Sequence, residues 1–113
     1  MIATTSVQAF QPTGTLLAYS STKGAIKTFI EGLAELAIKK GVRANAVAPG
    51  PVWTPLIPST MLPEKVKEFG KNSLLGRAAQ PAELAPAYVF LASNDARYIT
   101  GSILDVTGGR QIA

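Results

Sequence analysis

Apolar residues recur every three or four positions between Ala18 and Lys40, and this rhythm predicts a long amphipathic helix. The apolar positions are Ile26, Phe29, Ile30, Leu33, Leu36 and Ala37. Gly41 follows directly and provides a C-terminal stop. Before the helix, Pro12, Thr13 and Gly14 predict a turn, because proline fixes its own backbone angle and glycine closes tight bends.

Three short apolar runs predict buried strands, at Met1–Ser6, Val42–Ala48 and Ile99–Val106. The second run ends at Pro49 and Gly50, which interrupt extended structure. Runs that are continuously apolar are typical of parallel strands covered on both faces. We therefore expect these segments to lie side by side in one sheet.

Five prolines, at positions 49, 51, 55, 58 and 63, predict a long loop after the second strand, with a brief helix at Glu64–Phe69. A further helix is predicted from Pro81 to Ser93, with Glu83 in its first turn. Pro86 lacks a backbone donor, so we expect a bend or an irregular first turn near Ala82.

The predicted order is strand, helix, strand, loop, helix, strand, which indicates an α/β fold. We expect one partial domain over residues 1–113, built as a partial Rossmann-like parallel sheet of about three strands with helices. No internal repeat is found, and no second domain fits in 113 residues.

Composition narrows the function classes. The chain is 47% hydrophobic and 16% charged, which excludes a disordered tail. It has no Cys and no His, so disulfides, thiolate chemistry and the commonest metal ligand are absent. The net charge of +4 comes from scattered residues, and we expect no nucleic-acid partner. Lys39, Lys40 and Arg43 cluster where the long helix ends, as cations favoured by the helix dipole.

The longest apolar run, Leu84–Ala92, is interrupted by Pro86 and is too short to span a bilayer. The N-terminus also lacks the basic start and apolar stretch of a signal peptide. We therefore expect a soluble cytoplasmic protein without a membrane partner.

Tyr19 and Lys23 are the first candidates for chemistry, because four positions along a helix place them on one face. A fixed ammonium beside a phenol favours the phenolate, so Tyr19 could act as an acid or a base. The alternative interpretation is an ordinary solvated pair on a helix surface.

Further candidates follow the ends of the predicted strands, where ligands of parallel α/β sheets bind. Ser6 ends the first strand, and Pro49 and Gly50 end the second, before Val52 and Thr54. The competing interpretations are that Ser6 caps a strand end and that the prolines, glycines and Thr54 only shape turns. Trp53 would then be a core or interface aromatic, and Gly108–Gly109 a tight turn rather than a phosphate loop.

Taken together, these segments resemble the short-chain dehydrogenase/reductase family over essentially the whole chain. The matching elements are Thr4-Thr5-Ser6, Tyr19-Ser20-Ser21-Thr22-Lys23, Asn45-Ala46-Val47-Ala48-Pro49-Gly50-Pro51-Val52-Trp53-Thr54, and Tyr98-Ile99-Thr100-Gly101 with Asp105 to Gly109. The resemblance implies hydride transfer between NAD or NADP and a small alcohol or carbonyl substrate. It also implies a homo-oligomer, either a dimer or a tetramer.

The resemblance further implies a role for each matching residue. Tyr19 would be the acid when a carbonyl is reduced and the base when an alcohol is oxidised. Lys23 would ease proton loss from Tyr19 and hydrogen-bond the nicotinamide ribose, and Ser6 would hold the substrate oxygen. Pro49, Gly50, Val52 and Thr54 would lie at the nicotinamide side of the cofactor, with Val52 acting through its backbone.

The family's Gly-rich turn for the pyrophosphate has no counterpart among the ten glycines, and neither does the catalytic asparagine that precedes the serine. We therefore interpret the chain as the C-terminal catalytic half of a family member, starting inside a central strand. We expect it to be inactive and poorly soluble, or self-associating, when alone. Two alternatives stay open, a non-catalytic remnant or oligomerisation module of the family and, with less support, a small basic nucleic-acid binder.

Overall fold

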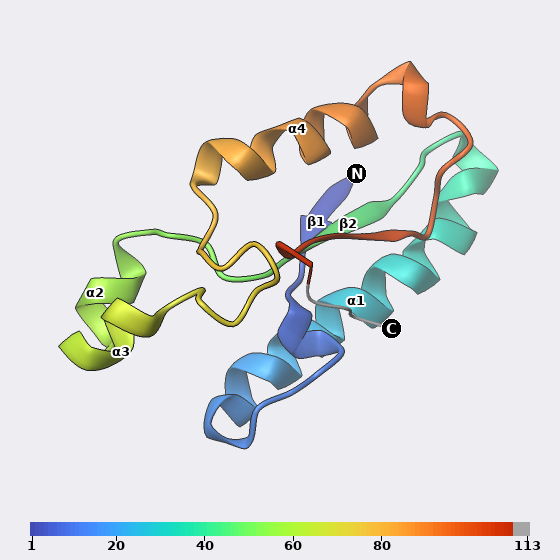
Figure 1. The fold of residues 1–113 in the computed structure, drawn as a ribbon. Coiled ribbons are helices and arrows are strands. Elements are labelled where there is room, and N and C mark those ends of the chain that lie inside the picture. Colours follow the sequence, from blue (N-terminus) through green and yellow to red (C-terminus); the bar gives the residue numbers. More distant parts are fainter. Residues whose placement is uncertain (110–113) are drawn as a thin grey trace.

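The computed structural model describes residues 1–109, and its centre is a three-stranded parallel sheet (Figure 1). The strands are β1 (Ile2–Thr4), β2 (Asn45–Pro49) and β3 (Ile103–Val106), in the order β1-β2-β3. Ile2 pairs with Asn45, and Ala46 pairs with Ile103. The predicted α/β class with about three parallel strands is confirmed.

Two helices cover the sheet from opposite sides. Helix α1 (Leu17–Ala37) lies on one face and helix α4 (Pro81–Ala92) on the other (Figure 1). Two short helices, α2 (Leu56–Thr60) and α3 (Pro63–Glu68), form a lobe beyond the carboxyl end of β2. Four 3₁₀ segments connect these elements: η1 (Val7–Ala9), η2 (Gly14–Leu16), η3 (Ile38–Lys40) and η4 (Asn94–Ala96).

The central strand β2 is the most buried part of the chain. Ala46, Val47 and Ala48 are completely buried, and Ala44 just before the strand is buried as well. Alanine side chains are short, so α1 can approach β2 closely and pack Ile30 against it. This packing explains why a strand of small residues forms here although alanine has a low intrinsic preference for strands.

The long helix ends as predicted. After the single 3₁₀ turn η3, Gly41 adopts φ 70°, a left-handed conformation that glycine reaches without strain. Lys39 and Lys40 lie in this last turn, where they face the negative end of the helix dipole.

The assignment of Arg43 to the same helix end was wrong. Its guanidinium donates instead to the carbonyls of Leu91 at 3.0 Å and Ser93 at 3.3 Å, at the C-terminus of α4. It also donates to the carbonyl of Ile99 at 3.2 Å. Arg43 therefore caps the helix on the opposite face of the sheet, because the planar guanidinium presents several donors at once.

All three strands are shorter than predicted, and β3 begins four residues late. The segment Ile99–Ser102 turns instead of extending, because its polar groups bind the start of β2. Asn45 donates to the Ile99 carbonyl at 3.0 Å and accepts from the Ser102 amide at 3.0 Å. Thr100 Oγ1 accepts from the Ala44 amide at 3.1 Å. This turn sets the register of β3 against β2.

Two proline-containing helices also differ from the prediction. Helix α2 was expected to be loop, yet Pro58 lies in its first turn, where a missing backbone donor costs nothing. Helix α4 runs unbroken from Pro81 to Ala92 and includes Pro86. At its start the Glu83 amide donates to the Gln80 carbonyl at 2.9 Å, a 3₁₀-type contact in the region where a bend or an irregular first turn was expected.

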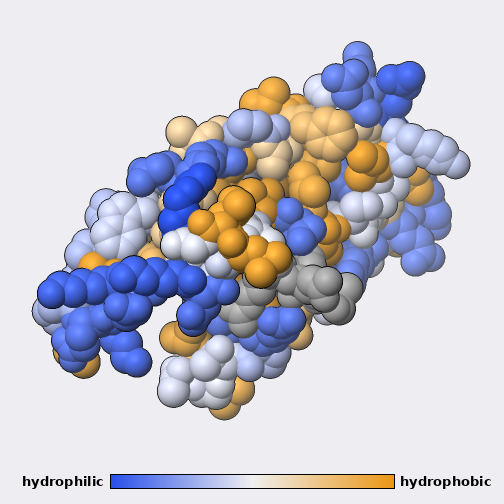
Figure 2. All heavy atoms as spheres, in the orientation of Figure 1, coloured by the Kyte–Doolittle hydropathy of each residue, from blue (hydrophilic) through white to orange (hydrophobic). Residues whose placement is uncertain are grey.

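Large apolar side chains remain exposed on the helices. Phe29 and Leu36 on α1 are 58% and 65% exposed, and Val89 on α4 is 69% exposed. Figure 2 shows apolar side chains gathered in the middle of one face of the molecule. Within residues 1–109, no helix combines the length and apolar character needed to cross a bilayer.

Candidate functional site

Tyr19 and Lys23 lie together in the first turns of α1. The Lys23 Nζ atom is 5.7 Å from the centroid of the Tyr19 ring, within the range of a cation–π contact. Lys23 Nζ also donates to the carbonyl of Thr4 at 3.2 Å, so the ammonium is held at the carboxyl end of β1. Tyr19 is 43% exposed, so part of this residue is accessible from solvent.

A second contact fastens the same helix to β1. Thr5 is buried, and its Oγ1 donates to the Lys23 carbonyl at 2.7 Å. The side chain of Lys23 therefore reaches back to Thr4 while its backbone is held by Thr5. This double attachment limits how far the Tyr19–Lys23 turn can move relative to the strand.

Ser6 follows β1 by two residues and is only 6% exposed. It is the N-cap of η1, and its Oγ accepts a hydrogen bond from the Gln8 backbone amide at 3.1 Å. The capping role considered from the sequence is therefore present, although it serves a 3₁₀ helix rather than a strand end. Because Ser6 Oγ is the acceptor in this contact, its own hydrogen stays available for donation.

Gln8, which the sequence patterns do not single out, connects the Ser6 segment to α1. Its side-chain Oε1 accepts from the Thr13 amide at 2.8 Å and from the buried Ser20 hydroxyl at 3.0 Å. Its Nε2 donates to Thr13 Oγ1 at 3.2 Å. Ser20 directly follows Tyr19, so one glutamine joins the two candidate catalytic segments.

Pro49 and Gly50 lie where β2 ends. Pro49 is the last residue of the strand and pairs with Val106, and the Gly50 amide donates to the Val106 carbonyl at 2.9 Å. A Cβ atom on Gly50 would lie 2.9 Å from the Thr107 Cα and 3.0 Å from its carbonyl oxygen. Glycine is therefore required here by close backbone packing.

Val52 forms a single parallel bridge with Ala79, which closes the base of the α2–α3 lobe. The bridge uses the Trp53 amide, which donates to Ala79 at 2.8 Å, and the Ala79 amide, which donates to Pro51 at 2.9 Å. Neither the N–H nor the C=O of Val52 takes part, since a parallel bridge uses the groups of flanking residues. These two groups of Val52 are free of the bridge.

Trp53 and Thr54 continue this segment into the lobe. The Trp53 ring packs against Phe69 with centroids 5.8 Å apart, so Trp53 is an aromatic of the lobe. The Thr54 carbonyl accepts from the Ile57 amide at 3.1 Å, which starts α2. The turn-forming interpretation of Thr54 therefore applies to its backbone.

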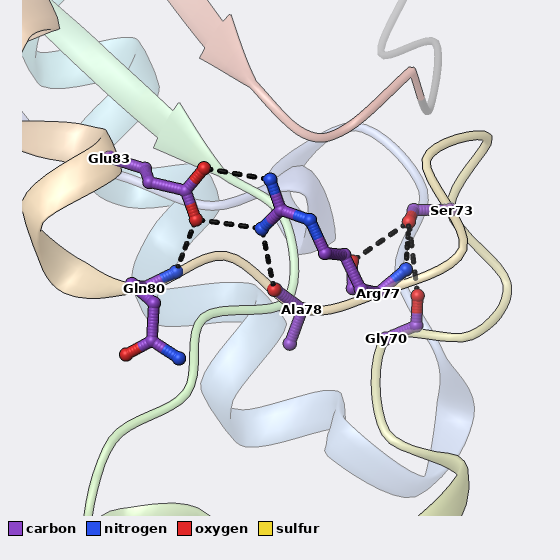
Figure 3. A network of polar contacts seen from close by, with 6 residues as sticks. All are labelled: Gly70, Ser73, Arg77, Ala78, Gln80 and Glu83. Atoms are coloured by element: carbon purple, nitrogen blue, oxygen red, sulfur yellow. Dashed lines mark hydrogen bonds and ion pairs between the residues drawn. The ribbon is translucent and has the colours of Figure 1, made fainter.

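An ion pair ties the loop that follows α3 to the first turn of α4 (Figure 3). Both terminal nitrogens of Arg77 donate to the Glu83 carboxylate, at 2.7 and 2.8 Å. The Arg77 side chain and the Gln80 backbone amide lower the pKa of Glu83 from 4.5 to about 2. Ser73 Oγ accepts from the Arg77 amide, which adds a third segment to the network. Glu83 was predicted only as a first-turn residue.

The Gly108–Gly109 pair forms a turn with φ of 68° and 104°, as expected. The Gly108 carbonyl accepts from the Leu75 amide at 3.0 Å. A Cβ atom on Gly109 would lie 2.6 Å from the Leu74 Cβ. The pair thus serves close packing against the loop after α3.

The candidate residues fall into two groups. Ser6, Tyr19 and Lys23 lie around the end of β1, whereas Pro49, Gly50, Val52 and Thr54 follow β2. Parallel strands end at the same edge of a sheet, so both groups lie on one side of the fold. In residues 1–109 no hydrogen bond joins one group to the other. The same residues contain no cluster of acidic side chains able to bind a metal.

Similar proteins are numerous. A family profile described as enoyl-(acyl carrier protein) reductase matches residues 1–111. The chain is 51% identical over 109 residues to the glucose and ribitol dehydrogenase homolog of Oryza sativa, covering 96% of this chain and 36% of that protein. It is 52% identical over 110 residues to the chloroplastic NADPH-dependent aldehyde reductase 1 of Arabidopsis thaliana, covering 96% of this chain and 38% of that protein.

Solved structures agree with these sequence matches. The 3-ketoacyl-(acyl-carrier-protein) reductase of Brucella melitensis, complexed with NADH, superposes with a TM-score of 0.86 at 34% identity. The match covers 96% of this chain and 43% of that one. The angucycline C-6 ketoreductase LanV with bound NADP superposes equally well, at 30% identity, over 96% of this chain and 42% of that one.

The chain spans less than half the length of these relatives. The profile match over residues 1–111, the identity above 50% and the shared parallel sheet all agree. The chain belongs to the short-chain dehydrogenase/reductase family of NAD(P)-dependent oxidoreductases.

Proposed function

We propose that this chain supplies the acid–base centre of an oxidoreductase that moves hydride between NAD or NADP and an alcohol or carbonyl compound. One observation carries the proposal: the Lys23 ammonium donates a hydrogen bond to the Thr4 carbonyl and also lies beside the Tyr19 ring. This holds a cation next to the partly exposed Tyr19 at the ligand-binding edge of the sheet. Two relatives, a glucose and ribitol dehydrogenase and an aldehyde reductase, carry names in keeping with this substrate class.

Three side chains have separate roles in the proposed proton transfer. Tyr19 donates its hydroxyl proton to the substrate oxygen during carbonyl reduction and takes a proton from the alcohol during oxidation. Ser6 donates its free hydroxyl hydrogen to the same oxygen, which polarises the carbonyl and fixes its position. The Lys23 ammonium stabilises the charge left on Tyr19 after the proton has moved.

The residues present suit the nicotinamide end of the cofactor. When bound, the cofactor supplies or accepts the hydride. Lys23 has three N–H donors and gives one to Thr4, so two remain for ribose hydroxyls. The free N–H and C=O of Val52 match the acceptor and donor of a carboxamide. Gly50 lets the backbone after β2 pass close to β3 at this end.

The chain lacks a Gly-rich turn for the pyrophosphate, so the rest of the cofactor site must come from other residues of a complete protein. We therefore propose that residues 1–113 are inactive alone and work as part of a longer, oligomeric polypeptide. The exposed apolar side chains of α1 and α4, among them Phe29 and Val89, favour burial against further chain or a second subunit. We also propose a cytoplasmic location, which cell fractionation can test.

The test is Tyr19→Phe in the complete enzyme, assayed with NADH and NADPH against panels of aldehydes and polyols. We expect kcat to fall by about 10²–10⁴-fold, because a positioned acid or base contributes that much. The cofactor dissociation constant should stay within about twofold, since the ring and Lys23 remain in place. Tyr98→Phe is the matched control, because this tyrosine is 93% exposed. Retained activity in Tyr19→Phe would remove Tyr19 from its proposed role, whereas a complete protein without any activity would favour the alternative, a non-catalytic remnant or oligomerisation module.

A further inference from the structure

A hydrogen-bond junction centred on the half-buried Gln8 joins the Ser6 segment to α1. The Gln8 backbone amide donates to Ser6 Oγ, while its side chain binds Thr13 and Ser20. Ser6 and Ser20 are both buried, at 6% and 5% exposed, so solvent cannot easily replace the contacts of Gln8 with these two serines, whereas its contacts with Thr13 are exposed. One residue thus touches the proposed substrate-oxygen donor and the turn that carries the proposed acid.

The junction leaves Ser6 little orientational freedom. A hydroxyl that accepts from a fixed amide must direct its hydrogen away from that amide. The Gln8 amide is fixed in turn because Gln8 Oε1 is held by two donors, one on the 12–14 turn and one on α1. Removal of the side-chain contacts would leave η1 attached through its own backbone hydrogen bonds and the buried Val7, and would loosen the direction of the Ser6 hydroxyl relative to α1.

We propose that Gln8 is the positioning residue that sets the Ser6 hydroxyl relative to the α1 turn carrying Tyr19. This inference rests on the proposed function. Gln8 acts through Ser6 and takes no proton itself. Hydride transfer and proton transfer require the substrate oxygen to meet both hydroxyls at once, and a displacement of about 1 Å costs about a hundredfold in rate.

The variants are Gln8→Leu, which removes the side-chain contacts at similar size, and Gln8→Glu, which keeps an acceptor oxygen for Thr13 and Ser20. Each is made in the complete enzyme, alone and combined with Ser6→Ala. We expect Gln8→Leu to lower kcat by about 10- to 100-fold with an unchanged cofactor dissociation constant. Gln8→Glu should recover part of that loss. In the Ser6→Ala background, Gln8→Leu should cause no further loss, since the group it positions is gone.

A matched serine pair provides the control. Ser20→Ala removes one donor to Gln8 and should lower kcat modestly, whereas Ser21→Ala should not, because Ser21 Oγ binds only the Leu17 carbonyl of its own helix. A Gln8→Leu loss that adds in full to the Ser6→Ala loss overturns the proposal, and so does a change confined to melting temperature. If Ser6→Ala and Tyr19→Phe are themselves fully active, the proposed function fails first, independently of Gln8.

Discussion

The sharpest stability prediction concerns Gly50, where β2 leaves the sheet. A methyl group there would lie 2.9 Å from the Thr107 Cα and 3.0 Å from its carbonyl oxygen, whereas carbon atoms prefer 3.5–4.0 Å. Relief requires the ends of β2 and β3 to separate, which stretches the 2.9 Å bond from the Gly50 amide to the Val106 carbonyl. Overpacking costs about 1–3 kcal/mol and the weakened bond about 1 kcal/mol.

Gly50→Ala should therefore lower the free energy of unfolding by about 2–4 kcal/mol. Gly32→Ala is the matched control, because Gly32 is exposed within α1 and a Cβ there meets no atom within 4 Å. It should raise the free energy of unfolding by about 0.5–1 kcal/mol. Denaturant unfolding followed by circular dichroism at equal protein concentrations measures both. Effects of the same sign in the two variants would refute the packing argument.

Three further predictions test other contacts. Because Arg77 lowers the pKa of Glu83 from 4.5 to about 2, the carboxylate stabilises the fold above its unfolded-state pKa and loses this effect as the pH falls toward 2. Glu83→Gln should therefore melt below the parent protein at neutral pH, with a difference that shrinks below about pH 4.5; a constant difference across a pH series of melting curves would contradict this. Asn45→Ala should cost about 1–3 kcal/mol in urea unfolding because it leaves the Ser102 amide unpaired, whereas the Ile99 carbonyl keeps its hydrogen bond from Arg43; faster hydrogen exchange at Ser102 should accompany the loss. Titration of the isolated 113-residue chain with NADH should show no saturable fluorescence change, and micromolar affinity would disprove the need for a separate pyrophosphate site.

Local patterns predicted the elements whose causes are local. Helix α1 follows from the spacing of its apolar residues, and Gly41 ends it because glycine adopts the left-handed conformation without strain. The start of β3 was misplaced because Ile99 and Thr100 favour strands, whereas contacts from Ala44 and Asn45 bend them. Those contacts join residues far apart in sequence and leave no local pattern.

In the candidate site, too, local patterns were predicted and long-range contacts were missed. The spacing of Tyr19 and Lys23 on one helix was enough to predict that they lie together. Gln8 was missed because its partners are five and twelve residues away and a lone glutamine carries no pattern. The predicted target of Arg43 was wrong for a related reason, because the helix end that Arg43 caps lies 48 residues further along the chain.

The parallel sheet also determines how late during protein synthesis this fold can be completed, because its last strand lies near the end of the described residues. Ile2 of β1 pairs with Asn45 of β2, and the Asn45 side chain binds Ile99 54 residues away. The entropy of closing such long loops is lost before the contacts form, which slows folding. While a ribosome still holds β3, the edge of β2 stays open to other nascent chains, so chaperone protection matters most in that interval.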